Sequence, residues 1–402
     1  MLSSSINLYR NAYSGLSKSI WWLSFIMFVN RSGAMVIPFL TVYLTVKLKF
    51  SIAEAGTIMG IFGMGAVIGA WMGGRLTDRI GFYQVQFWSL ILNGIMFIVL
   101  GQMKTFAELG ICIFILSMVG EAFRPANSAA IASYSKIENL TRSYSLNRLA
   151  INLGFSVGPA LGGILAAYDY HLLFWVDGIT CIVAAFIFIL VLPVIKTSTA
   201  DKKTNREKAK ADPAYKDSLF LKFIFLVFLV AVCFLMLFNM VPIYYKEKIN
   251  LSVFTIGLLL AMNGLIIVLI EMVLIYKMEG KRRLSFFISI GAFLVGLSFL
   301  LLNIAETFLV TIVAMIFITF GEIFMFPFIN TFWVQRSKDH NRGQYGALFT
   351  MAFSIALIIA PTMGSQIIHQ FGFQTLWYLN FSLCTIAAIG FIKLLKEKKS
   401  NV

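Results

Sequence analysis

Gly120-Glu121-Ala122-Phe123 returns 201 residues later as Gly321-Glu322-Ile323-Phe324, and a proline follows each copy, at Pro125 and Pro327. Other residues keep almost the same offset, half the length of the 402-residue chain: Ser51 with Ser252, Asp78 with Glu279, Gly162 with Gly364, and Asp177 with Asn380. This offset indicates a duplicated chain. In an apolar protein, two parallel halves are typical of a transporter whose binding site lies where the halves meet.

The composition points to a membrane as the solvent. The chain is 59% hydrophobic and 13% charged, whereas an average soluble domain is about 25% charged. A bilayer-spanning helix needs about 20 mostly apolar residues, and continuous runs of this length differ from the short alternating strands of a barrel. We therefore predict an all-α membrane protein with twelve transmembrane helices, at 19–44, 54–74, 83–103, 107–133, 144–168, 172–194, 219–246, 253–277, 284–303, 307–335, 342–369 and 372–395.

The net charge of +15 has a distribution that fits a membrane topology better than a nucleic-acid partner. If the N-terminus is inside, 26 of the 33 Lys and Arg residues fall in inner segments and 5 in outer loops. Basic residues concentrate on the cytoplasmic side of membrane proteins. We expect an integral plasma-membrane protein, in a bacterial inner membrane, with both termini cytoplasmic.

One long polar segment, 195–218, divides the chain. It is rich in basic residues and lacks apolar periodicity, which predicts a flexible cytoplasmic linker that is able to contact anionic lipid headgroups. The predicted domains are a six-helix half at 1–194, this linker, and a second six-helix half at 219–402. The four cysteines lie in apolar runs without metal-ligand spacing, and no phosphate-binding loop or nucleophile elbow is present. We therefore expect neither a metal, nor a cofactor, nor an enzyme.

The loop after the second span carries a recognisable motif, Gly74-Arg75-Leu76-Thr77-Asp78-Arg79-Ile80-Gly81. Its glycines permit a tight turn and close helix approach, and Asp78 is placed to pair with a basic residue or a neighbouring helix N-terminus. The loop resembles the signature Gly-x-Leu-x-Asp-Arg-x-Gly of the major facilitator superfamily, except that Phe82 and Tyr83 stand where basic residues usually follow. The resemblance implies a gating role for Gly74, Asp78, Arg79 and Gly81, and a monomer.

The fifth span holds small residues at regular spacing: Gly154, Gly158, Pro159, Gly162 and Gly163. Small residues four apart form a smooth face for close helix contact, and a proline bends the helix. The pattern resembles the Gly-Pro-rich fifth helix of proton-linked exporters in the same superfamily. It implies export of a small, amphipathic molecule in exchange for protons, with close packing alone as the alternative explanation.

Charges inside the spans are the candidate transport residues. Arg31, Glu121, Arg124 and Glu322 lie near the centres of their runs, where each charge costs about 2.5–3.5 kcal/mol on insertion scales and so faces a cavity or a partner. The resemblance implies that helices 1, 4, 7 and 10 line the central cavity, and three of these carry all four charges. Glu271, nearer the inner end of its span, is a fifth candidate, with snorkelling or pairing with Lys277 as alternatives.

Coupling to protons is predicted from the carboxyl groups, since no ATP site is present. Arg31 and Arg124 should keep Glu121 ionised; alternatively, Arg31 is only a counter-ion and the Glu121/Arg124 pair only fastens helix 4. Glu322 has no basic residue in its own span, so we expect an unpaired, protonatable carboxyl and make it the first choice of proton carrier. Two other functions stay open: a proton-coupled uptake symporter for an amino acid, peptide or sugar, and a non-transporting receptor or scaffold.

Overall fold

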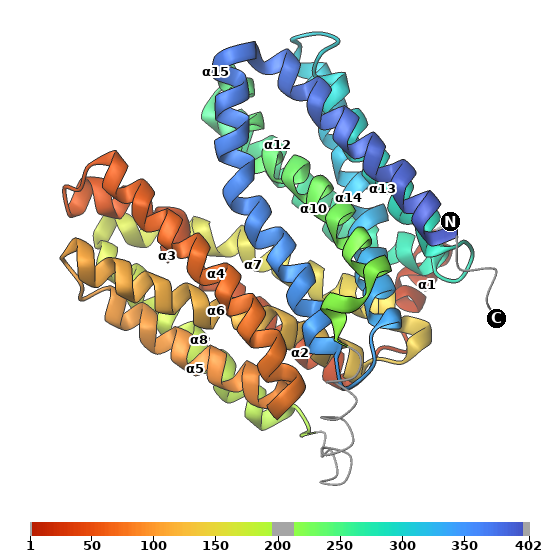
Figure 1. The fold of residues 1–402 in the computed structure, drawn as a ribbon, viewed down its shortest axis with the longest axis horizontal. Coiled ribbons are helices and arrows are strands. Elements are labelled where there is room, and N and C mark those ends of the chain that lie inside the picture. The colour runs from red at the N-terminus through yellow and green to blue at the C-terminus, as the bar shows by residue number, and fades with distance from the viewer. Residues whose placement is uncertain (1, 195–212, 397–402) are drawn as a thin grey trace. The chain divides into compact units, whose positions relative to one another are not determined.

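The computed structural model describes residues 2–194 and 213–396, and its regular structure in these ranges is helical, without strands. The helices before the linker are α1 (Leu2–Tyr13), α2 (Lys18–Ser32), α3 (Val36–Val42), α4 (Ile52–Ile80), α5 (Phe82–Leu100), α6 (Phe106–Tyr134), α7 (Leu140–Tyr168) and α8 (Tyr170–Val191) (Figure 1). Those after it are α10 (Ser218–Asn239), α11 (Val241–Glu247), α12 (Val253–Met278), α13 (Leu284–Leu301), α14 (Phe308–Arg336) and α15 (Arg342–Lys396). Short helical turns occur at η1 (Tyr43–Lys47), η2 (Ile137–Asn139) and η3 (Ala214–Lys216).

The predicted spans agree with these helices. Within the described residues, 11 helices are long and apolar enough to cross a membrane. The last of them, α15, contains two predicted spans, because the backbone at Gly372 is not helical (φ 80°, ψ 171°) and separates two helical arms. Both arms are drawn in blue in Figure 1. The fold is therefore all-α, with the helix pattern that the two apolar half-sequences predict.

The first predicted span differs from the prediction. The apolar run 19–44 predicts one continuous helix, but α2 ends at Ser32 and α3 begins at Val36. The corresponding span of the second half only bends: at the turn between α10 and α11, Met240 still donates to the carbonyl of Met236 at 2.9 Å. A helix over residues 2–13 was also not predicted, because that stretch is polar.

The chain packs as two compact units. Among the described residues, the first unit contains Gly15–Tyr215 and Ser337–Met351, and the second contains the residues up to Ser14, Lys216–Arg336 and the residues from Ala352 on. Each unit thus consists mainly of one half of the sequence. The half boundaries at 194 and 219 stay a prediction, and residues 195–212 of the predicted linker lie outside the described residues.

Equivalent residues of the repeat start equivalent helices. Ser51 accepts a hydrogen bond from the N–H of Glu54 at the start of α4, and Glu54 accepts in return from the N–H of Ser51. Ser252, its partner in the repeat, caps α12 in the same way through the N–H of Thr255. These caps satisfy N–H groups that the first helical turn leaves free. The sequence duplication is therefore expressed in local structure as well as in helix order.

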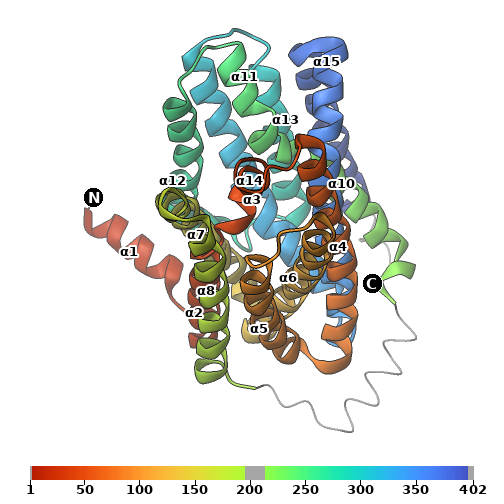
Figure 2. The same ribbon diagram turned by 90° about the vertical axis from the view of Figure 1, so that its left-hand side faces the viewer.

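In the first unit, α8 lies beside α2 and α5, and α2 also packs against α7 (Figure 2). The core here joins Met35 and Val36, at the break between α2 and α3, to Leu40, Phe97 and Phe174. Large apolar side chains such as Trp88 and Phe186 remain about half exposed, as expected for surfaces that meet lipid. The break between α2 and α3 is thus part of the buried core of this unit, in contact with neighbouring helices.

Candidate functional site

A carboxylate from α8 holds the break between α2 and α3. The backbone N–H groups of Met35 and Val36 both donate to Oδ2 of Asp177, at 3.2 and 3.1 Å. Asp177 is only 2% exposed. Backbone N–H groups at a helix start have no partner within the helix, and a charged acceptor satisfies them strongly. Asp177 therefore supplies a partner for the N–H of Val36 and a second partner for that of Met35, which also donates to the carbonyl of Gly33 at 2.7 Å.

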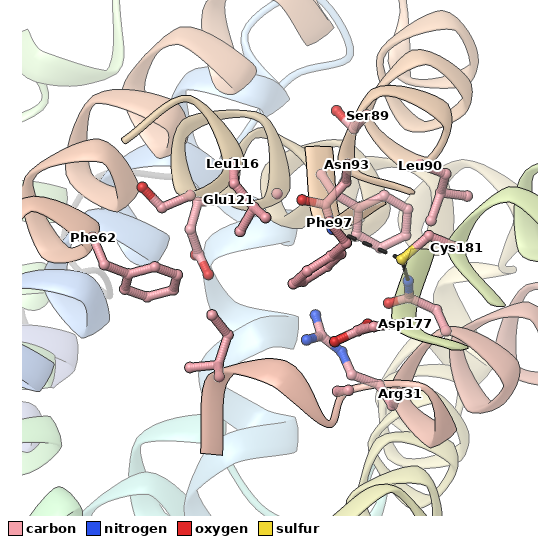
Figure 3. Close-up of a pocket in the computed structure, with 16 residues that line it drawn as sticks. Arg31, Phe62, Ser89, Leu90, Asn93, Phe97, Leu116, Glu121, Asp177 and Cys181 are labelled. Carbon is pink, nitrogen blue, oxygen red and sulfur yellow. Dashed lines mark hydrogen bonds between the residues drawn. The ribbon is translucent and has the colours of Figure 1, made fainter. Parts of the chain in front are cut away.

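A cavity of about 100 Å³ lies beside this break, inside the first unit. Its polar lining residues come from α2, α5, α6 and α8 and are Asn30, Arg31, Ser89, Asn93, Ser117, Glu121 and Asp177. Figure 3 shows the guanidinium of Arg31 next to the carboxylate of Asp177, while the carboxylate of Glu121 points into the same space from α6. This space is large enough for a few water molecules.

Arg31 connects the charged groups of this cavity. It interacts electrostatically with Arg124, Glu121 and Asp177. Its guanidinium carbon lies 5.6 Å from the centre of the Phe155 ring on α7, a cation–π distance. Its Nε has no hydrogen-bond partner among the described residues. The arginine is thus held by charge and by the aromatic ring, with donor capacity left for the cavity.

Glu121 and Arg124 form an ion pair on one face of α6. Nε of Arg124 lies 3.0 Å from Oε2 of Glu121, and the side chains are 44% and 14% exposed. The approach lacks the alignment of a hydrogen bond, because the same Oε2 has no hydrogen-bond partner among the described residues. The predicted pair of residues three apart is therefore present.

Neutral groups complete the wall behind Asp177. The side-chain amide of Asn30 donates to Sγ of Cys181 at 3.3 Å, and that of Asn93 lies 3.8 Å from the same sulfur. Oδ1 of Asn93 has no partner among the described residues. Several buried polar atoms around the cavity are therefore free to bind water.

In the second half, Glu322 on α14 has a partner on α12. Nδ2 of Asn263 donates to Oε1 of Glu322 at 2.7 Å and also lies 3.0 Å from Oγ1 of Thr319. Glu322 is 3% exposed. The carboxyl thus accepts a hydrogen bond from a neutral amide that lies 59 residues away in sequence, on another helix. A neutral donor favours the ionised carboxylate without contributing a charge.

Glu271, the other candidate of this half, lies on α12 and is 1% exposed. It does not snorkel to the surface, so that alternative is wrong. Its neighbourhood includes the N-terminal helix: Tyr9 on α1 donates from its hydroxyl to the carbonyl of Leu269. Burial first, and then the nearby Tyr9 and Glu271, raise the pKa of Tyr13. Glu271 is thus covered by α1, which the sequence pattern does not predict.

The loop motif after α4 meets the start of α15. The carboxylate of Asp78 accepts hydrogen bonds from the N–H groups of Gly343 and Gln344, at 2.6 and 2.9 Å. A helix N-terminus was one of the two predicted partners of Asp78, and this geometry confirms it. A side chain at Gly74 would overlap Gly343, and Gly81 has a φ of 92° that favours glycine. Arg79 is exposed.

The glycines of α7 pack against the helix break. A Cβ at Gly154 would lie 2.5 Å from Cβ of Arg31, and one at Gly158 would lie 3.1–3.3 Å from the carbonyl oxygens of Arg31, Ala34 and Ser32. Gly162 lies against Phe39 and Met35, and Gly163 has more room, with Phe39 3.8 Å away. Pro159 is helical in its backbone, and its side chain is outside the described ones. The predicted smooth face therefore exists, and its partner is the break.

A family model described as the Major Facilitator Superfamily matches residues 20–361. The chain belongs to the Major Facilitator Superfamily. Its fold and its family are those of transporters rather than enzymes, and its helices make it an integral membrane protein. The motif around Asp78 is thus the loop of a superfamily member, as its residues predict.

The similar proteins include an antiporter, a drug-resistance protein and a symporter of known structure. The chain is 26% identical over 399 residues to a Na(+), Li(+), K(+)/H(+) antiporter of Planococcus maritimus, covering 91% of this chain and 92% of that protein. It is 27% identical over 185 residues to the quinolone resistance protein NorA of Staphylococcus aureus, 46% of this chain and 47% of that one. The solved proton:xylose symporter XylE aligns with a TM-score of 0.72 and 16% identity, over 94% and 96% of the two chains. The last likeness concerns the fold alone.

The structure groups the predicted residues of this superfamily member by half. Arg31, Glu121 and Arg124 come together in one unit, and Glu322 and Glu271 belong to the other. The sequence reasoning missed Asp177 and Asn263. Asp177 is a charge inside an apolar run, the sixth residue of the predicted span 172–194, and a count of all charges within spans finds it. Asn263 gives no such signal, because a neutral amide in a span is common and its partner is 59 residues away.

Proposed function

We propose that this superfamily member exports a small, amphipathic molecule in exchange for protons, and that Glu322 carries the exchanged proton. The observation that carries the proposal is the burial of Glu322 beside a neutral amide, Asn263. A carboxylate inside a membrane span is costly, and an amide donor offsets only part of that cost. A buried carboxyl in such a position is a candidate to bind and release the exchanged proton.

The first-half cavity supports a role in handling protons rather than the exported molecule. Its volume of about 100 Å³ suits a few waters, whereas sites for drug-sized molecules have about 300–1,000 Å³. Glu121 is the second carboxyl of the proposal, and Arg31 and Arg124 compete for it. Alternating access by rocking of the halves is the expected movement.

Export is supported by the α7 glycine pattern and by two relatives, whose names describe an antiporter and a quinolone resistance protein. The antiporter relative also favours a second candidate, exchange of a monovalent cation for protons. The two candidates differ in which solute, an amphipathic molecule or a monovalent cation, is exchanged for protons across the membrane of sealed vesicles.

The test uses purified protein in proteoliposomes with an acidic interior and a pH-sensitive dye. The proposal expects the quinolone norfloxacin to collapse the pH gradient, and Glu322→Gln to abolish this response at equal protein content. Collapse by sodium or potassium salts, with no response to norfloxacin, would establish the second candidate instead. No solute-dependent proton movement at all would refute both.

The orientation is also part of the proposal: a monomer in the bacterial inner membrane, with both termini and the 195–218 linker cytoplasmic. Cysteines placed at Ser198 and Ser400 should resist an impermeant thiol reagent in intact cells and react after the cells are opened. A cysteine at Gln102, in the loop after α5, is the control that should react in intact cells. Labelling of the cysteine at position 198 or 400 in intact cells would contradict the cytoplasmic placement of the linker or the C-terminus.

A further inference from the structure

We propose that Asp177 is a positioning residue for proton coupling: it holds the break between α2 and α3 so that Arg31 faces Glu121 across the cavity, and its charge balances that of Arg31. The proposal rests on the proposed proton exchange and adds a residue and a mechanism to it. Three features support it: the backbone at the break, the charges around the cavity, and the contrast with the other half.

The first feature is the backbone. Both N–H groups after the break, at Met35 and Val36, donate to one oxygen of Asp177, and that of Met35 also donates to the carbonyl of Gly33 at 2.7 Å. On the opposite side, Gly158 of α7 leaves room for the carbonyl groups of Arg31, Ser32 and Ala34. A continuous helix would satisfy these donors and acceptors internally. The contacts from α8 and α7 therefore stabilise the break between α2 and α3. Arg31 is the last residue but one of α2, and its direction follows from where that helix ends.

The second feature is the set of charges around the cavity. Arg31 on α2 interacts with Asp177 on α8 and with Glu121 and Arg124 on α6. The thiol of Cys181, on the same helix as Asp177, also interacts with Arg31. From α5, the neutral Asn93 lines the cavity. With both carboxylates ionised, two positive and two negative charges balance. Removing the charge of Asp177 leaves a net positive cluster, and a positive cluster binds a proton less readily.

The third feature is the contrast with the other half. Asn380 occupies the position equivalent to Asp177 in the repeat, and it is fully buried. Neither polar atom of its side chain has a partner among the described residues. The span that it would hold, α10 with α11, only bends. A carboxylate at this position accompanies a broken helix, and an amide accompanies a bent one.

The experiment has two arms on purified protein. Hydrogen–deuterium exchange measures the amides of Met35 and Val36, and Asp177→Ala should increase their exchange by about tenfold or more, since a hydrogen bond to a charged acceptor is lost. Proton exchange in proteoliposomes measures the pH of half-maximal rate, which Asp177→Asn should lower by roughly one unit. Asn380→Ala is the control and should change neither quantity.

A double variant distinguishes positioning from general damage. If Asp177 acts through Arg31 on Glu121, then Asp177→Asn shifts the pH profile in the native protein but not in Glu121→Gln, which lacks the responding carboxyl. The same shift in both backgrounds would overturn the proposal, as would unchanged amide exchange in Asp177→Ala. If the alanine variant does not fold, Asp177→Asn, which keeps an acceptor oxygen, decides through the pH arm. If Asp177→Ala shows faster amide exchange but the native protein moves no protons, the proposed function is refuted. The conclusion that Asp177 holds the break between α2 and α3 then still stands.

Discussion

The two units use carboxylates in different ways. In the first, Asp177 and Asp78 each accept hydrogen bonds from two backbone N–H groups at the start of a helix. In the second, Glu322 accepts from a side-chain amide. A carboxylate bound to backbone donors fixes the position of a helix, and protonation would disturb that position. A carboxylate that accepts from a neutral side chain can change its charge with little movement of the backbone.

This difference separates holding from exchanging. It assigns the helix positions of the first unit to aspartates that bind backbone donors, and the exchanged proton to Glu322 of the second, with Glu121 of the first unit as the second carboxyl. Arg31, which lines the first-half cavity, interacts with both kinds of carboxylate, Asp177 and Glu121. The following predictions, in order of decreasing effect, test the division.

The largest effect is expected at Glu322. Glu322→Gln removes the titrating group and should abolish accumulation driven by a pH gradient, while downhill exchange or binding continues. Glu121→Gln should reduce the same rate only partly. Both are measured as solute accumulation in proteoliposomes with and without a pH gradient. If both variants keep full gradient-driven transport, the comparison fails and Glu271 becomes the candidate.

Asp78 tests whether an ionised carboxylate is needed to hold a helix start. Asp78→Asn weakens two hydrogen bonds to a charged acceptor, each worth about 1.5–3 kcal/mol, and should slow transport about tenfold while the protein still folds. Asp339→Asn is the matched control, because Asp339 lies just before the same helix and its side chain is 86% exposed. Equal rates for Asp78→Asn and the native protein at matched expression would refute a gating role.

Asn263 tests the second unit by changing the partner rather than the carboxyl. Asn263→Leu removes a donor that favours ionised Glu322, so the proton should be released only at higher pH. The pH of half-maximal proton exchange should rise by about half a unit, as expected for a neutral hydrogen bond. This shift is opposite in sign to the one expected for Asp177→Asn. A shift toward lower pH, or none, would show that Asn263 does not act on the coupling carboxyl.

The smallest effect concerns packing. Gly154→Ala places a methyl group against the main chain and Cβ of Arg31, and overpacking of this kind costs about 1–3 kcal/mol. Gly364→Ala meets only the flexible side chains of Met236 and Met240, which can move aside. Thermal unfolding of purified protein should show a lower midpoint for Gly154→Ala and a nearly native one for Gly364→Ala and for Gly163→Ala. Equal midpoints for all three variants would contradict the close contact between α7 and the break.

Much of the fold follows from the sequence alone. Apolar runs of about 20 residues must become helices in a bilayer, because each backbone group needs a partner that the lipid does not offer. The repeat and the motif around Asp78 are visible in the sequence, and the structure agrees with both, since Ser51 and Ser252 start equivalent helices and Asp78 binds a helix N-terminus. The charged residues Arg31, Glu121 and Glu322 were also identified in this way, because charges stand out within apolar runs.

Only the tertiary structure decided which of these groups meet. The break between α2 and α3 is invisible in the apolar run 19–44, since hydrophobicity along a chain does not record where a backbone donor finds its acceptor. Asp177 lies 142 residues from Met35 and holds it, and Asn263 lies 59 residues from Glu322 and binds it. A sequence fixes the cost of a buried charge through its position within a span. The partner that offsets the cost comes from another helix, and the packing of the helices selects it.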